Sequence, residues 1–136
     1  MLLDKTNNYL ECKNLLENNM SSLLDNNCKI INSNYSEQGH LLYLNILYMG
    51  YKIKFESYQD LFDIDIYDSE MAFTNLCFQY KFNNIMNIEN IKNAFQLLKE
   101  MIIINDFPLY IINGDKKYMK YKGTIKRIKQ IKKAYE

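Results

Sequence analysis

The chain has 136 residues, of which 48% are hydrophobic and 24% charged, and its formal net charge is +1. These fractions are typical of a folded globular domain and argue against an intrinsically disordered chain, while the lack of a long apolar run argues against a membrane-spanning helix. The first residues lack the basic and apolar segments of a signal peptide, so we expect one cytoplasmic domain spanning residues 1–136.

Residue usage is skewed toward amino acids with AT-rich codons. The chain has 18 Asn, 17 Ile and 12 Tyr, but one Pro and no Trp. We interpret this as genome bias, of the kind expected in an AT-rich bacterium, its phages or its plasmids. Cys12, Cys28 and Cys77 are odd in number and widely spaced, which fits neither a disulfide framework nor a metal-binding pair. We expect free thiols in a reducing compartment.

The N-terminal part of the chain predicts a helix that leads into a sheet. Residues 4–24 place apolar side chains at three- and four-residue steps, and the sequence Asp25-Asn26-Asn27 ends the pattern. Residues 28–35 then predict a first short strand. The apolar stripe of the helix consists of Tyr9, Cys12, Leu16, Met20 and Leu23.

The middle of the chain predicts further strands joined by tight turns. The apolar run 41–48 and the alternating run 51–56 are separated by Met49-Gly50, which predicts a two-residue hairpin in which Gly takes a positive φ. A single helical turn is expected over 58–61, before a second alternating strand over 62–66. Together with residues 28–35, the first two of these strands form a predicted three-stranded meander.

The next segment has two interpretations. A turn over 67–70 leads to residues 71–82, whose spacing of Phe73, Leu76 and Tyr80 suits a helix. The alternation of large side chains over 76–82 favours a strand instead, because aromatic residues at every second position suit a half-buried sheet. We take the strand as the prediction for 76–82.

A strongly amphipathic helix follows. It begins after Asn87, a favourable N-cap, and carries an apolar face that recurs at helical spacing. Asn105 and Asp106 end it, and Pro108, the sole proline, prevents its continuation. The apolar face comprises Ile88, Ile91, Phe95, Leu98 and Ile102.

The C-terminal segment predicts a hairpin and a last helix. Asn113-Gly114 between residues 109–112 and 115–122 is a strong hairpin signal. Thr124 is the expected N-cap of a helix over 125–135. The whole chain is therefore predicted to be an α+β domain with a mostly antiparallel sheet of about 5–7 strands, packed by three helices on one face in the order α-βββ-ββ-α-ββ-α.

Catalytic signatures are missing from the sequence. His40, the single histidine, stands beside a run of leucines, where a turn or core role is the simpler interpretation. The sequence contains no phosphate-binding glycine loop, nucleophile elbow or zinc-protease motif. We therefore expect a protein that is not an enzyme and that uses no cofactor or metal.

Two charged regions are candidate binding surfaces. The first is acidic, and we interpret it as a surface for a partner; a Mg²⁺ site at Asp63 and Asp65, which share one face of a strand, is the alternative. Carboxylates spaced along an edge could also mimic the phosphates of a nucleic acid. The acidic residues are Glu56, Asp60, Asp63, Asp65, Asp68 and Glu70.

The second region is the basic C-terminal segment. Residues 116–136 carry eight lysines and Arg127 against Glu136, a net of +8, whereas residues 1–115 carry eight lysines against fifteen acids, a net of −7. Lysines interleaved with a tyrosine suit a phosphate backbone and a stacked base, and a helix N-terminus at Thr124 would add free N–H groups for an anion. Protection of an edge strand and neutralisation of the acidic region are the alternatives. The candidate residues are Lys116, Tyr118, Lys120, Lys122, Thr124, Lys126, Arg127, Lys129 and Lys133.

These features favour a small non-catalytic binding protein. The first hypothesis is an inhibitor that engages a protein or protein–nucleic acid complex of nucleic-acid processing and blocks or modulates it, as phage anti-defence proteins of the anti-CRISPR kind do. The second is a nucleic-acid-binding module that uses the C-terminal hairpin and helix. A metal-dependent enzyme and a homodimer formed through a sheet edge are the remaining alternatives; no membrane partner is expected.

Overall fold

The computed structural model describes residues 2–36, 38 and 41–135, with side chains from residue 8 onward. It is an α+β protein in which, over the described residues, eight strands form one antiparallel sheet and four helices accompany it. The helices are α1 (Leu2–Asn18), α2 (Met20–Leu23), α3 (Leu76–Gln79) and α4 (Ile88–Ile104). The strands are β1 (Cys28–Ser36), β2 (Leu41–Tyr48), β3 (Tyr51–Tyr58), β4 (Leu61–Tyr67), β5 (Phe73–Asn75), β6 (Leu109–Asn113), β7 (Lys116–Tyr121) and β8 (Thr124–Ile128).

The sheet is a meander in which each strand pairs with the strands next to it in sequence. The predicted hairpin at Met49-Gly50 is confirmed: Tyr48 pairs with Tyr51, and Met49 and Gly50 have φ of 50° and 85°. Both central residues of this turn are left-handed, which matches the twist of the two strands it joins. The α+β class was predicted correctly, whereas the strand number exceeds the prediction.

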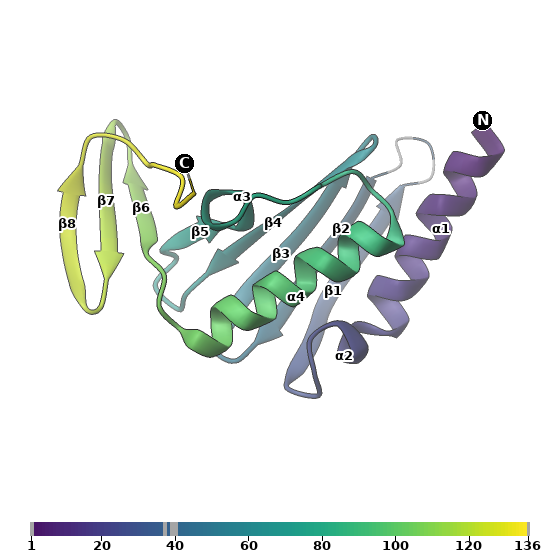
Figure 1. The fold of residues 1–136 in the computed structure, drawn as a ribbon, viewed down its shortest axis with the longest axis horizontal. Helices are drawn as coiled ribbons and strands as arrows, with labels where there is room; N and C mark the ends of the chain where they lie inside the picture. The colour runs from purple at the N-terminus through teal and green to yellow at the C-terminus, as the bar shows by residue number, and fades with distance from the viewer. Residues whose placement is uncertain (1, 37, 39–40, 136) are drawn as a thin grey trace.

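The helices α1, α2 and α4 lie on one face of β1–β4 and form the core with it (Figure 1). Side chains alternate along these strands, so every second residue points to the helices. The predicted stripe of the first helix is buried, although Asn19 divides the helix into α1 and α2. The inward strand residues with at most 1% exposure are Leu42, Leu44, Ile46, Tyr48, Ile53, Phe55, Phe62, Ile64 and Ile66.

The central core helix α4 agrees closely with its prediction. Asn87 caps it by accepting a hydrogen bond from the Asn90 N–H at 2.7 Å, and Asn105 ends it in the left-handed conformation. Phe95 lies on its buried face and stacks against Phe55 of β3, with ring centroids 6.1 Å apart. Among the described residues, none of the helices combines the length and the apolar character needed to cross a bilayer.

Strand β4 changes partner along its length. Its C-terminal half pairs with β5, whereas the Phe62 N–H donates to the Asn84 carbonyl at 3.0 Å in the segment that follows α3. Between these two partners, the Ile64 N–H donates to Oδ1 of Asp63 at 3.0 Å. The Asp63 carboxylate therefore satisfies a backbone donor at the point where the neighbouring strand is interrupted.

Two expectations for the middle of the chain are wrong. Residues 58–61 form no helical turn, because Gln59 has a φ of 56° and reverses the chain between Tyr58 and Leu61. Residues 76–82 form no strand, because β5 ends at Asn75, whose side chain accepts the Cys77 N–H and starts the short helix α3. The local side-chain hydrogen bond outweighs the preference of the following aromatics for a sheet.

The predicted last helix, 125–135, is also wrong. Lys122 and Gly123 have φ of 49° and 79°, so they reverse the chain and return it as β8, in which Thr124 pairs with Tyr121. Thr124 is thus a strand residue and caps no helix. The neighbouring hairpin is confirmed with its turn one residue later than expected, at Gly114-Asp115.

Strands β6–β8, called the C-terminal sheet below, extend away from the helices at the end opposite to α1 (Figure 1). In the described chain, one register pair, Phe73 with Tyr110, joins this sheet to β5. The residues after β8 return toward α3, where the Ala134 N–H donates to the Phe78 carbonyl at 2.7 Å. The C-terminal segment therefore folds back across one face of the C-terminal sheet.

Candidate functional site

The predicted acidic and basic regions meet at the turn between β4 and β5. Nζ of Lys120 lies 2.8 Å from Oδ2 of Asp68 and 3.1 Å from Oε1 of Glu70. Burial acts to raise the pKa of Asp68, but hydrogen bonds from Lys120 and from two backbone N–H groups outweigh it and lower the pKa. For Lys120, Asp68 and Glu70, the basic and acidic regions therefore neutralise each other within the molecule, which was one of the alternatives.

Asp63 and Asp65 lie on one face of β4, as the alternation predicts, and share a bridging side chain. Nδ2 of Asn75 donates to Oδ1 of Asp63 at 2.7 Å and to Oδ1 of Asp65 at 2.6 Å. Burial raises the pKa of Asp65, against the opposing effect of the hydrogen bond from Asn75. The amide uses both of its N–H groups to hold two like charges side by side, so this pair has a structural task in the sheet.

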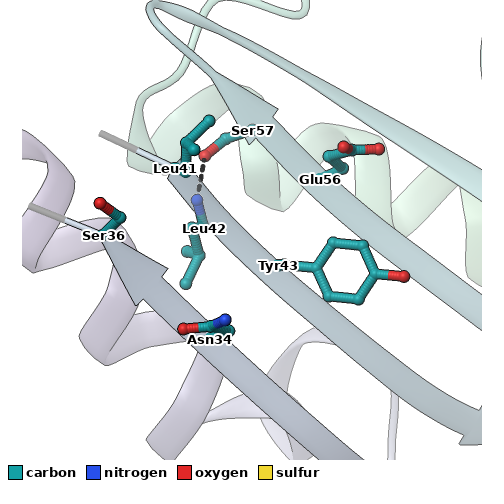
Figure 2. Close-up of a pocket in the computed structure, with 7 residues that line it drawn as sticks. All are labelled: Asn34, Ser36, Leu41, Leu42, Tyr43, Glu56 and Ser57. Carbon is teal, nitrogen blue, oxygen red and sulfur yellow. Dashed lines mark hydrogen bonds between the residues drawn. The ribbon is translucent and has the colours of Figure 1, made fainter. Parts of the chain in front are cut away.

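The face of β1–β5 turned away from the helices, called the open face, carries Glu56 between two depressions. The first, of about 360 Å³, lies at the ends of β1–β3, and Figure 2 shows its lining with the hydrogen bond from the Leu42 N–H to the buried Oγ of Ser57. Its residues are Asn34, Ser36, Leu41, Leu42, Tyr43, Glu56 and Ser57. Asp60 lies in the β3–β4 turn, where its carbonyl accepts the Met86 N–H. The hypothesis for His40 lies outside the described residues.

The second depression, of about 620 Å³, brings Cys77 and Lys133 next to Asp63. Sequence reasoning did not anticipate this meeting of α3 with the C-terminal segment. Burial, followed by the charge of Asp63, raises the pKa of the Cys77 thiol to about 11. A thiol with this pKa is protonated at neutral pH, so it lacks the activation of a nucleophilic cysteine.

The basic residues of the C-terminal sheet divide into engaged and unengaged groups. Lys120 is engaged as described, and Lys122 lies 4.0 Å from Asp106 and over the ring of Tyr121. Lys133 lies over the Tyr135 ring. Within the part of the chain that the structure describes, six further cations form no ion pair: Lys116, Lys117, Lys126, Arg127, Lys129 and Lys132.

The sheet geometry arranges the unengaged cations on two faces. Lys116, Tyr118 and Lys120 share one face of β7, as the alternation predicts, and Arg127 of β8 is the register partner of Tyr118. Lys126 points to the other face, beside Met119. Lys126, Lys129 and Lys133 were expected within the predicted last helix, but the first lies in β8 and the other two follow it in irregular chain.

A third depression, of about 450 Å³, lies between the C-terminal sheet and the returning C-terminal segment. Its apolar side consists of side chains that sequence reasoning did not single out, although the period of two in β7 places Met119 opposite to the face of Tyr118. Among the described residues, no cluster of three or more metal-ligating side chains was found. The lining residues are Tyr110, Met119, Ile128, Lys129, Gln130 and Lys132.

Comparison with known proteins returned no match: no family model, no curated protein and no solved structure resembles the chain. The assignment of function therefore depends on the geometry and charge of these surfaces alone.

Proposed function

We propose that this protein is a non-catalytic nucleic-acid-binding protein that uses its C-terminal sheet, together with the segment that follows it, as the contact surface. The observation that carries the proposal is the gathering of six cations within residues 116–132, none of which forms an ion pair with a described residue. Cations gathered on one projecting element attract a phosphate backbone and release its counterions on binding.

The fate of the opposite charges supports this choice of surface. Asp68 and Glu70 are paired with Lys120, and Asp63 and Asp65 are held by Asn75. The acidic region is thus largely engaged within the protein, whereas most of the basic region faces solvent. An anionic partner meets no comparable competition at the C-terminal sheet.

The exposure of the C-terminal sheet also suits a binding surface better than a part of the folded core. Every residue of β8 from Thr124 to Arg127 is exposed, and the C-terminal sheet lies away from α1, α2 and α4 (Figure 1). Tyr118 is half-buried and flanked by cations on its own face, an arrangement that suits a stacked base between phosphates.

Fluorescence anisotropy with labelled 20-nucleotide DNA and RNA, single-stranded and duplex, tests the proposal. If all six cations contact phosphates of a single strand, affinity should fall by about 10²–10³-fold between 50 and 200 mM salt. The double variant Lys126→Glu/Arg127→Glu should abolish binding, whereas Lys29→Glu/Lys92→Glu, with the same charge change on other surfaces, should retain most of it. Absence of salt-dependent binding to all four nucleic acids at micromolar protein would overturn the proposal.

A second candidate function is an inhibitor that contacts a nucleic-acid-processing complex directly, in the manner of phage anti-defence proteins. The open face favours it, because Glu56 stands between two depressions and Nζ of Lys54 lies 5.1 Å above the Tyr43 ring. Mixed aromatic and charged groups on an uncovered sheet suit a protein interface.

Affinity capture from phage-infected bacterial lysates distinguishes the two functions. Under the second, Glu56→Lys should lose the partner while Lys126→Glu/Arg127→Glu keeps it. Capture that requires Lys126 and Arg127 and is lost after nuclease treatment would instead support the nucleic-acid-binding function.

A further inference from the structure

The depression between the C-terminal sheet and the returning segment combines an apolar floor with free polar groups. Tyr110 and Met119 are register partners on β6 and β7, and Ile128 of β8 lies diagonally beside Met119 through its pairing with Lys117. The Tyr110 ring is 5% exposed and is held edge-on by Phe78, with centroids 6.4 Å apart and planes at 83°. The Tyr110 ring at the base of the floor is therefore held in place before any ligand arrives.

The opposite wall comes from the chain after β8. Lys129, Gln130 and Lys132 line it, and the hydrogen bond from Ala134 to Phe78 keeps this segment folded back beside α3 (Figure 1). Neither lysine forms an ion pair and the Gln130 amide forms no hydrogen bond within the described chain. Two cations and one amide therefore remain available to a ligand.

The combination specifies the chemistry of that ligand. An apolar floor suits the flat face of a ring, an amide suits the hydrogen-bonding edge of a nucleobase, and two lysines suit its flanking phosphates. The volume of about 450 Å³ lies within the range of small-molecule sites. A base in a duplex must be unpaired and unstacked before it can enter the depression, whereas a base of a single strand enters at a lower cost.

We propose that this depression binds one unstacked base of a single-stranded nucleic acid, with Lys129 and Lys132 on the adjoining phosphates and Gln130 at the base edge. The inference rests on the proposed nucleic-acid-binding function and deepens it by naming the strand state and the site. Duplex binding then uses the cations alone, whereas a single strand gains the additional contact with Met119 and its neighbours.

Anisotropy measurements with three 12-nucleotide ligands test the inference: a single strand, its duplex, and a backbone whose central residues are abasic. The single strand should bind about tenfold tighter than the other two, which corresponds to one base–side-chain contact of the usual strength. A 2-aminopurine at the central position should change its fluorescence on binding, because it leaves the stack.

Two variants locate the effect. Met119→Ala and Gln130→Ala should each remove most of the preference for the single strand without weakening binding of the abasic backbone. Ile125→Ala, an exposed apolar residue on the other face of the C-terminal sheet, is the matched control and should leave the preference intact. Gln130 is exposed and outside any strand, so its variant retains the fold and carries the test if Met119→Ala unfolds.

The possible outcomes distinguish failure of the base site from failure of the proposed nucleic-acid-binding function. Equal affinity for all three ligands, abolished by Lys126→Glu/Arg127→Glu, would overturn the base site and leave the proposed function standing. A preference for the single strand that survives Met119→Ala and Gln130→Ala would also overturn the site. Absence of binding to every ligand would remove the proposed function and the base site together.

Discussion

The antiparallel strands β1–β4 are covered by helices on one face. The strands of the C-terminal sheet have the same backbone pairing but differ in burial and in the partners of their charged side chains. In β2–β4 most inward side chains are fully buried beneath α1 and α4, and on the other face Asp63 and Asp65 are hydrogen-bonded to Asn75. In β7 and β8 every residue retains some exposure, and most cations have no partner in the described chain. Antiparallel strands tolerate both conditions because backbone pairing does not depend on a covering layer.

Under the proposed function, the covered region provides stability and the C-terminal sheet provides recognition. Burial of apolar surface is the dominant stabilising contribution in a domain of this size, and the C-terminal sheet adds little beyond Leu109 and Tyr110. Unengaged charge contributes little to folding but strongly affects association. Changes in the covered region should therefore alter stability, and changes in the C-terminal sheet should alter binding.

The largest expected effect comes from emptying the covered core. Phe95→Ala removes a fully buried ring stacked on Phe55 and should lower the free energy of unfolding by about 3–5 kcal/mol. Ile125→Ala in exposed β8 should change it by less than about 0.5 kcal/mol. Urea denaturation followed by circular dichroism measures both, and equal losses would contradict the division between the two regions.

A smaller effect is expected at the open face of the covered region. Asn75→Ala removes the amide that bridges the carboxylates of Asp63 and Asp65 and should lower the free energy of unfolding by about 1–3 kcal/mol at pH 7. Since the lost hydrogen bond favours the ionised form of Asp65, and burial raises the pKa of this carboxyl, the deficit should shrink as pH falls through that raised pKa, starting above the ordinary value of about 4. Adding Asp65→Asn should recover part of the loss, and no recovery would show that charge repulsion is not its cause.

The smallest effect concerns the link between the two regions. Lys120→Met removes the ion pairs with Asp68 and Glu70 and should lower the melting temperature by on the order of 2 °C. The hydrogen bonds to both carboxylates raise the pKa of Lys120, while the pKa of Asp68 is lowered despite burial because its hydrogen bonds outweigh that effect. The stabilisation should thus be lost as pH falls below about 4 and again as it rises above about 10.

Melting curves of the wild type and Lys120→Met across this pH range provide the measurement. Lys116→Met, which removes a lysine without an ion pair from the same face, is the control and should show no such dependence. A difference between wild type and Lys120→Met that is independent of pH would show that packing of the lysine stem, and not the ion pair, links the regions.

Sequence reasoning succeeded where the structure depends on neighbouring residues. The left-handed turn at Met49-Gly50 and the helix cap at Asn87 depend on residues adjacent in sequence, so the sequence predicts them directly. The last helix failed because isoleucines at three-residue spacing fit a helix, while pairing with β7 and the contact with Phe78 depend on distant chain. The depression at Met119 could not be predicted for the same reason. Its two walls are separated in sequence and meet only after the C-terminal segment folds back.

The order of the strands also has a consequence for how the protein folds. Each strand from β1 to β5 and from β6 to β8 meets its partner directly along the chain, so most of the sheet forms by closing short loops. Pairing of β5 with β6 is different, because α3 and α4 intervene before Phe73 meets Tyr110. Since folding rate falls as the sequence separation of contacts grows, this junction should form late, after two independent meanders already exist.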